Sequence, residues 1–255
     1  MVRMARRMPS ARFQDLVDAA TAVFIAQGYR RTQMADVAAA MGLAKGTVYL
    51  TVESKEALFD VALRYADAPR PIAAPAKLPI PTPARGRILR YARERLAREP
   101  ASLTLRDALA RRRAPVTGEE LTCIVRELHD VMARNRTGLK LVDRCASEYP
   151  ELAKLWFGEG RGALLEDLTQ YLKRGIHHGT FRRVPDARVA ARVIIETVVF
   201  WAVHRHWDPA PQPVDPRTAE DTIIQMLVGA LCGAEHRPPR HGTGSGKTRV
   251  GTESR

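Results

Sequence analysis

Apolar residues in the first quarter of the chain recur every three or four positions, the spacing of one face of an α-helix. The clearest stripe runs through residues 11–27 and consists of Phe13, Leu16, Val17, Ala20, Val23 and Phe24. Gly28 follows it directly, and glycine is the residue that most readily ends a helix. We therefore predict an amphipathic helix over residues 11–27 that packs against the elements after it.

Residues 32–59 predict two short helices joined by a tight turn. The apolar face of the first consists of Met34, Val37, Ala38 and Met41, and Thr32 is its candidate cap. Gly42 stands where this helix must stop, because a residue without a Cβ atom enters the left-handed conformation at little cost. Val48 is the inward anchor of the second helix, which we expect over residues 45–52.

The outward side of this second helix carries Lys45, Gly46, Thr47 and Tyr49. Its side chains suit hydrogen bonds to phosphates and base edges, and they do not form a catalytic set. The pattern therefore predicts a helix-turn-helix. Ser54 is placed to cap a further helix over residues 55–67.

A proline-rich segment, residues 68–84, follows. Its prolines are Pro69, Pro71, Pro75, Pro79, Pro81 and Pro83. Because proline removes a backbone donor and breaks helices, we predict an extended linker. A docking site for a partner that reads proline-rich sequence is the alternative.

The rest of the chain returns to helical spacing and has no alternating strand pattern, so we predict an all-α protein. The expected helices cover residues 85–98, 103–112, 119–149, 150–178, 186–206 and 216–232. Pro150 and Pro216 suit first-turn positions, and Asp186 and Asp215 are candidate caps.

The predicted organisation is a DNA-binding domain over residues 11–67, the linker, a larger helical domain over 85–233, and a disordered basic tail over 234–255. The tail contains HGTGSGKT, residues 241–248, which is similar to a phosphate-binding loop. His241 occupies the position of the first glycine of that motif, and no strand is expected before it. We interpret the segment as part of the tail, and a nucleotide-hydrolysing enzyme is the alternative.

The helices expected over residues 186–206 and 216–232 are too apolar for one buried face. The run VAARVIIETVVFWAV is apolar nearly all round, and the last helix adds Ile223, Ile224, Met226, Leu227, Val228 and Leu231. Such helices must be covered on more than one side. We therefore expect them to form a homodimer interface as well as part of a core.

The chain has 41 basic and 28 acidic residues and a net charge of +13, which favours a polyanionic partner, nucleic acid before membrane. Three widely spaced cysteines predict buried thiols in a reducing compartment and no metal site. The N-terminus lacks the apolar core of a signal peptide, and no apolar stretch reaches the ~18 residues of a membrane span. We expect a soluble cytoplasmic protein without a membrane partner.

The run GLAKGTVYL followed by ESKEALF resembles the DNA-binding domain of the TetR family of bacterial transcriptional regulators. The resemblance covers roughly residues 12–67. Thr51 stands where the family usually has Tyr or His, and Val52 where it usually has Phe. Thr51 removes an expected phosphate contact, and Val52 leaves less apolar bulk under the second helix. The run RTGLKLVDRCASEYPELAKLWFGEG is similar to the regulatory domain of an AefR-like subgroup.

The resemblance implies a homodimeric regulator, with repression as the expected mode, that leaves a palindromic DNA operator when a small-molecule effector binds its larger domain. We expect the DNA-binding residues to be Thr32, Ala44, Lys45, Gly46, Thr47, Tyr49, Leu50 and Lys55. Arg3, Arg6, Arg7 and Arg12 form a candidate electrostatic arm. An architectural DNA-binding protein without an effector is the alternative.

Five aromatic residues are candidates for an effector pocket: Tyr149, Trp156, Phe157, Phe200 and Trp201. Apolar cavities with a few polar groups are the usual small-molecule sites, although packing in the core or dimer interface is the alternative for each residue. The histidines lack metal-ligand spacing, and no nucleophile or carboxylate pair stands out. We therefore predict no metal, no cofactor and no enzyme activity.

Overall fold

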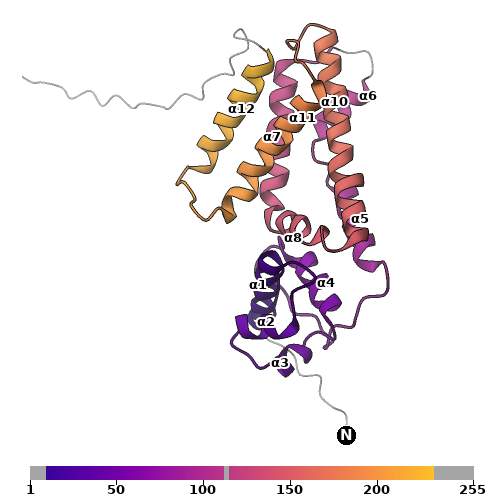
Figure 1. The fold of residues 1–255 in the computed structure, drawn as a ribbon, viewed down its shortest axis with the longest axis vertical. Coiled ribbons are helices and arrows are strands. Elements are labelled where there is room, and N and C mark those ends of the chain that lie inside the picture. The colour runs from indigo at the N-terminus through magenta and orange to yellow at the C-terminus, as the bar shows by residue number, and fades with distance from the viewer. Residues whose placement is uncertain (1–9, 112–114, 233–255) are drawn as a thin grey trace, which may run out of the picture.

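The computed structural model describes residues 10–111 and 115–232. Within these residues the protein is helical, and its one β-bridge joins Val52 to Ile80. A small group of helices from the N-terminal part lies at one end, and a longer helical bundle rises from it (Figure 1). The predicted all-α fold class is confirmed. The tail motif at 241–248 and the arm residues Arg3, Arg6 and Arg7 lie outside the described residues.

The small group consists of α1 (Ser10–Gln27), α2 (Met34–Ala40), α3 (Lys45–Tyr49) and α4 (Lys55–Tyr65). The predicted stripe of α1 faces inward, because Phe13, Leu16, Val17, Ala20 and Phe24 are all buried. Gly28, with a φ of 83°, ends α1, and the Ser54 hydroxyl accepts a hydrogen bond from the Ala57 N–H at the start of α4. The helix expected over residues 45–52 is shorter than predicted and ends at Tyr49.

The bundle is built from eight further α-helices of the described chain. They are α5 (Arg87–Arg98), α6 (Leu103–Ala110), α7 (Gly118–Arg134), α8 (Arg136–Ala146), α9 (Pro150–Ala153), α10 (Arg161–His177), α11 (Ala187–Ala202) and α12 (Pro216–Cys232). A π-helical segment, Lys154–Gly160, connects α9 to α10, and a short 3-10 helix, His204–Trp207, follows α11. Two buried apolar clusters result, one centred on the N-terminal helices and one on the bundle.

Two long helices expected from the sequence are interrupted. The helix predicted over residues 119–149 divides at Asn135, whose side-chain amide donates to the Val131 carbonyl at 2.9 Å and so competes with the helical backbone. The helix predicted over 150–178 contains the π-helical segment, which ends in the sequence GEG. Glycine is a poor helix former, and π-helical turns occur often at functional sites.

The predicted starts of three helices are confirmed. Pro150 and Pro216 are the first residues of α9 and α12. The Asp186 carboxylate accepts hydrogen bonds from the Arg188 and Val189 N–H groups at 2.7 and 3.0 Å. Short-range signals therefore located the helix starts better than the breaks within long helices.

Candidate nucleic-acid interface and ligand cavity

The turn between α2 and α3 has the geometry that the sequence predicts. Gly42 has a φ of 64°, which is the left-handed conformation expected there. The Leu43 N–H donates to the Ala38 carbonyl at 2.8 Å and closes the end of α2. Ala38 and Val48 are both buried, so the two helices pack through small and medium apolar groups. The helix-turn-helix is therefore formed by the residues that predicted it.

The outward face of α3 is open to solvent. Tyr49 is 41% and Leu50 67% exposed. The other predicted contact residues around α3 are Ala44, Lys45 and Gly46, which are exposed, and Thr47, which is half-buried. The face thus combines a cation, a hydroxyl, a phenol and two apolar groups on one short helix.

Two other predicted DNA-binding residues have different roles. Thr32 is fully buried, and its hydroxyl donates to the Gly28 carbonyl at 2.7 Å, so its side chain is not available to DNA. The Lys55 ammonium donates to the Tyr29 and Arg30 carbonyls at 3.1 and 3.2 Å. It uses two of its three donors there and holds the α1–α2 loop against α4. Internal carbonyl oxygens therefore bind both side-chain donors, and DNA contacts at Thr32 and Lys55 remain predictions.

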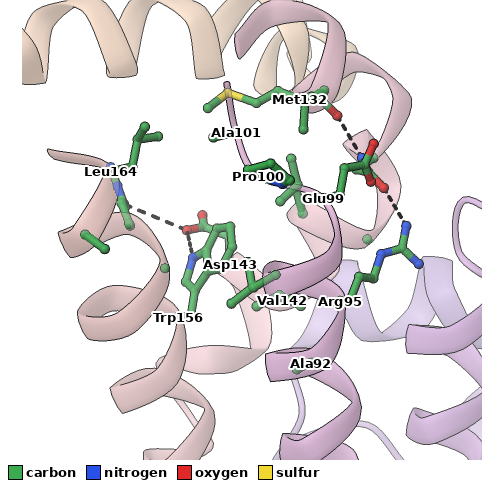
Figure 2. A pocket seen from close by; sticks show the side chains of 18 of the residues that line it. Ala92, Arg95, Glu99, Pro100, Ala101, Met132, Val142, Asp143, Trp156 and Leu164 are labelled. Carbon is green, nitrogen blue, oxygen red and sulfur yellow. Dashed lines mark hydrogen bonds and ion pairs between the residues drawn. The ribbon is translucent and has the colours of Figure 1, made fainter. Parts of the chain in front are cut away.

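A cavity of about 390 Å³ lies inside the bundle. Helices α5, α7, α8, α10 and α11 and the π-helical segment form its walls (Figure 2). Most of the lining is apolar and includes Leu96, Met132, Val142, Leu155, Leu164 and Ile195. A volume and lining of this kind are typical of a small-molecule site.

Charged groups at the cavity wall are paired with one another. On one side, the Asp143 carboxylate accepts a hydrogen bond from the Trp156 indole N–H at 3.2 Å and lies 4.0 Å from the Arg161 guanidinium. Figure 2 shows Asp143 and Trp156 opposite Arg95 and Glu99. On that second side, Arg95 donates to the Asn135 side-chain oxygen, whose amide group donates to Glu99 at 3.0 Å.

Of the five aromatic residues predicted to bind an effector, the structure places only Trp156 at this cavity. Tyr149 stacks on Tyr29, with ring centroids 5.3 Å apart. Phe157 and Phe200 are exposed, and Trp201 packs edge-on against Phe200. The presence of aromatic residues in the sequence does not indicate whether they line a cavity, lie on the surface or pack between helices. The residues that sequence analysis missed are the polar ones, Arg95, Asp143 and Arg161, and no local signal separates them from the other charged residues of their helices.

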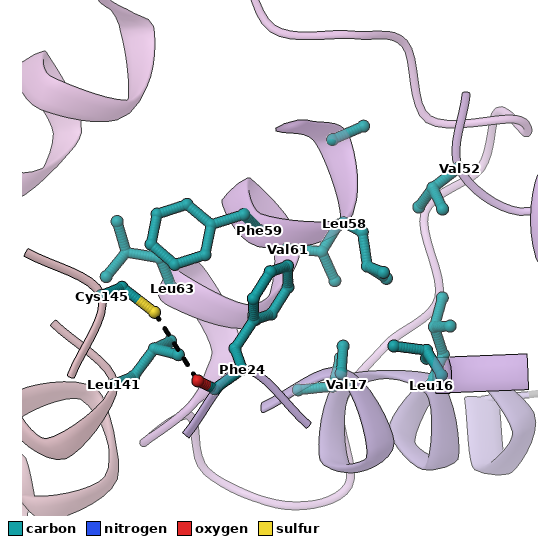
Figure 3. Close-up of a cluster of buried hydrophobic side chains, with 14 of the residues drawn as sticks. Leu16, Val17, Phe24, Val52, Leu58, Phe59, Val61, Leu63, Leu141 and Cys145 are labelled. Carbon is teal, nitrogen blue, oxygen red and sulfur yellow. Dashed lines mark hydrogen bonds between the residues drawn. The ribbon is translucent and has the colours of Figure 1, made fainter. Parts of the chain in front are cut away.

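Helix α8 lies between the cavity and the helix-turn-helix group, although Leu63 of α4 also reaches the cavity wall. Its residues Gly138, Leu139, Val142 and Asp143 line the cavity. Leu141 and Cys145 instead enter the apolar cluster of α1 and α4 (Figure 3). The Cys145 thiol lies 3.8 Å from the Phe24 carbonyl oxygen, and burial raises the pKa of this thiol to about 12. One short helix therefore contacts both regions.

Polar contacts reinforce this junction. Arg144 donates to the Gln27 carbonyl at 2.8 Å and forms an ion pair with Glu148 at 2.9 Å. Glu148 also accepts the Arg30 N–H at 2.8 Å, and this bond, with the contribution of Arg144, lowers the pKa of its carboxyl group. Gly28 lies so close to Arg144 and Glu148 that a Cβ atom there would clash with both.

The end of the α4 segment is tied to α8 as well. The Asp67 carboxylate accepts the Thr137 and Gly138 N–H groups, each at 2.9 Å, and lies 3.6 Å from Arg95. Burial raises the pKa of Asp67, and these donors oppose the increase. Asp67 also lines the cavity, so one carboxylate joins the cavity wall to the segment that follows α4.

The outer faces of α11 and α12 carry exposed apolar side chains among polar ones, such as Arg192 on α11 and Asp221 on α12. Val193 is 53% and Met226 69% exposed, and Val189 and Phe200 continue the α11 stripe at helical spacing. This agrees with the excess of apolar surface that the sequence predicts. Leu227, by contrast, is partly buried against the bundle core.

His129, Asp130 and Glu220 are the one group of possible metal ligands that converges within the described ranges, with ligand atoms within 4.8 Å of one another. The Arg126 guanidinium lies 3.2 Å from the Glu220 carboxylate and neutralises it. The group is therefore an ion-pair cluster that joins α7 to α12. In the described part of the chain, no helix has both the length and the apolar character needed to cross a membrane.

An exposed helix-turn-helix joined to a hollow helical bundle defines a DNA-binding transcriptional regulator. The model of bacterial regulatory proteins of the tetR family matches residues 16–62, and that of the AefR-like transcriptional repressor C-terminal domain matches residues 119–230. The chain belongs to the TetR family, whose members are regulators. Among curated proteins, none matches this chain.

Solved structures with the same fold include the ketosteroid transcriptional regulator KstR2 of Mycobacterium tuberculosis. It is 17% identical, the match covers 91% of this chain and 100% of that chain, and the TM-score is 0.55. The TetR family transcriptional regulator PfmR from Thermus thermophilus is 18% identical over 84% of this chain and 96% of its own, with a TM-score of 0.49. FadR from Bacillus subtilis, in complex with stearoyl-CoA, is 18% identical over 86% and 98%, with a TM-score of 0.44.

Proposed function

We propose that this protein is a homodimeric repressor that reads a palindromic operator with α3 and is released when a small apolar molecule enters the bundle cavity. The observation that carries the proposal is the position of α8, which lines the cavity on one side and packs into the cluster of the DNA-binding helices on the other. An architectural DNA-binding protein has no need for such a shared wall.

The exposed face of α3 suits the major groove. We assign Lys45, Gly46 and Thr47 to base edges, and Tyr49 to a phosphate that fixes the register. Leu50, which is strongly exposed, offers an apolar contact to a thymine methyl group. Two such helices would read half-sites about 34–36 Å apart, one turn of DNA.

The exposed apolar side chains of α11 and α12 support the dimer. Two copies related by a twofold axis would cover Val193 and Met226 of each subunit. In such a dimer the same surface patch of both subunits forms the interface, so no second patch is needed. This pairing fixes the distance between the two copies of α3. A change in the angle between bundle and DNA-binding helices then alters the half-site spacing.

The cavity suits a neutral ligand with a large apolar part. Arg161 lies between Asp143 and Glu196, and Arg95 lies beside Asp67, so these cations are already compensated by carboxylates of the protein. A strongly charged ligand would have to compete with these existing ion pairs for its partner. A ligand that moves α8 lowers the affinity for DNA only if it binds more tightly to the conformation that does not bind DNA. The size of the decrease is set by that difference in ligand affinity.

Selection of duplexes from a random DNA pool tests the DNA-binding half of the proposal. The wild-type protein should enrich one palindromic sequence with half-sites about one helical turn apart. The Lys45→Ala variant should enrich it poorly. A wild type that retains all sequences equally would favour the architectural alternative and reject the proposed repressor.

A further inference from the structure

The proline-rich segment 68–84 connects α4 to α5 and packs along the DNA-binding helices. At its first end, Arg70 forms an ion pair with Asp18 of α1 through two hydrogen bonds of 2.8 and 2.5 Å. Ile72 is buried in the apolar cluster of α1 and α4, and its N–H lies 3.4 Å from the Gln14 side-chain oxygen. We call residues 68–84 the strap.

The second end of the strap holds the residues immediately after α3. The Ile80 N–H donates to the Thr51 carbonyl at 2.7 Å, and the Glu53 N–H donates to the Ile80 carbonyl at 3.0 Å. Thr82 continues this contact, because its N–H donates to the Glu53 carboxylate and its hydroxyl to the Ser54 hydroxyl, both at 2.9 Å. The exit of α3 is therefore bonded to the strap through backbone and side chains.

Helix α3 needs external support. It has 5 residues, and a helix of that length has little stability of its own. Its inward anchors are Val48 and, just beyond it, Val52, which is fully buried. The Ile80 side chain packs against the same apolar cluster, so the strap supplies apolar bulk beside a small Val52.

We propose that the strap is a positioning element that sets the orientation of α3 for sequence-specific reading, with Ile80 as its central residue. The strap continues directly into α5, whose Tyr91, Ala92 and Arg95 line the cavity. It therefore gives α3 a second connection to the cavity, separate from α8. This inference rests on the proposed function, because it presupposes that α3 distinguishes DNA sequences.

Ile80→Pro is the sharpest test. Proline keeps an extended backbone but removes the N–H that binds the Thr51 carbonyl. The probes are the duplex that the wild type selects from the random pool and a duplex of unrelated sequence. We expect affinity for the selected duplex to fall about tenfold or more, and affinity for the unrelated duplex to change less than about twofold, since the charges are unchanged. Hydrogen exchange in a peptide spanning residues 45–55 should become faster.

Ala76→Pro is the matched control, because Ala76 is an exposed strap residue that takes no part in these hydrogen bonds. It should behave as the wild type on both duplexes. Thr82→Val serves as a milder second variant if Ile80→Pro lowers the melting temperature strongly, and it should cause a smaller loss in the same direction.

Unchanged selected-duplex affinity in both Ile80→Pro and Thr82→Val would overturn the positioning role. Equal losses on both duplexes would also overturn it, because a direct phosphate contact produces that result. If the wild type selects no duplex at all, the proposed function fails instead, and the two failures are thereby distinguished.

Discussion

The outward face of α3 and the cavity of the bundle are both functional surfaces, but they are built in different ways. The face of α3 comes from consecutive residues, Ala44 to Leu50, that a short turn presents to solvent. The cavity is assembled from α5, α7, α8, α10 and α11, whose sequences are far apart. A site made by neighbours in the chain is readable from the sequence, whereas a site made by packing is not.

The largest expected effect comes from breaking the assembly that makes two α3 faces act together. Met226→Glu places a charge at the most exposed large apolar residue of α12, where burial in a dimer would be costly. We expect monomers in sedimentation experiments and at least about a 100-fold loss of affinity for the selected duplex. The neighbouring Gln225→Glu, also exposed, is the control and should stay dimeric.

Leu227 is a poorer choice for this test, because it packs partly against the core of the bundle. A charge there would damage the fold as well as the interface. A dimeric Met226→Glu protein with wild-type affinity would contradict the proposed interface.

The next effect separates two lysines of the DNA-binding region. Lys45→Ala should cost about 1–3 kcal/mol on the selected duplex and less on unrelated DNA, because Lys45 is assigned to base edges. Lys55→Ala should mainly lower the melting temperature, by about 2–4 °C, because its ammonium holds the Tyr29 and Arg30 carbonyls. Fluorescence anisotropy and calorimetry measure the two quantities. A larger loss of DNA affinity in Lys55→Ala than in Lys45→Ala would reverse the assignment.

Tyr49→Phe refines the same comparison. It removes only the hydroxyl assigned to a phosphate, so affinity should fall by a similar factor on every sequence, by about three- to tenfold. A loss of affinity restricted to the selected duplex would instead assign Tyr49 to a contact with a base edge.

These residues also show how far the sequence leads. Gly42, Val48 and the α1 stripe act within a few positions of one another, so spacing was sufficient to place them. The internal hydrogen bonds of Thr32 and Lys55 were not predicted, because their partners, the carbonyls of residues 28–30, come from the loop after α1. Tyr149 and Phe200 were misjudged because a helical pattern does not say which neighbour covers an aromatic ring.

The strap illustrates the same limit. Its prolines predict an extended segment, but nothing local indicates that Ile80 pairs with Thr51 and Glu53 on the exit of α3. Val52 provided an indirect signal, since a small residue at an expected bulky position implies that another group fills the space.

The smallest expected effect concerns the junction between the two regions. The pKa of Glu148 lies below its ordinary value of 4.5 because it accepts the Arg30 N–H and pairs with Arg144. Its contribution to stability is therefore complete at neutral pH and is lost as the pH falls below about 4.5. Glu148→Gln should melt slightly lower than the wild type at pH 7, and this difference should shrink toward pH 3. A difference in melting temperature that stays constant with pH would show that the charge of Glu148 does not contribute to stability.

The central claim is that occupation of the cavity weakens DNA binding. A panel of neutral long-chain alcohols, phenols and sterols should contain compounds that raise the melting temperature, because a ligand that binds the folded state stabilises it. Ala163 lies exposed at the cavity, so Ala163→Trp should block entry and abolish the increase, while Ala163→Ser keeps it.

The most direct measurement is the affinity of the wild type for its selected duplex with and without such a compound, alongside Ala163→Trp. We predict that the stabilising compound lowers the affinity of the wild type at least about fivefold, the scale of ordinary allosteric coupling, and leaves Ala163→Trp unchanged. A compound that stabilises the wild type through this cavity but leaves its DNA affinity unaltered would contradict the account.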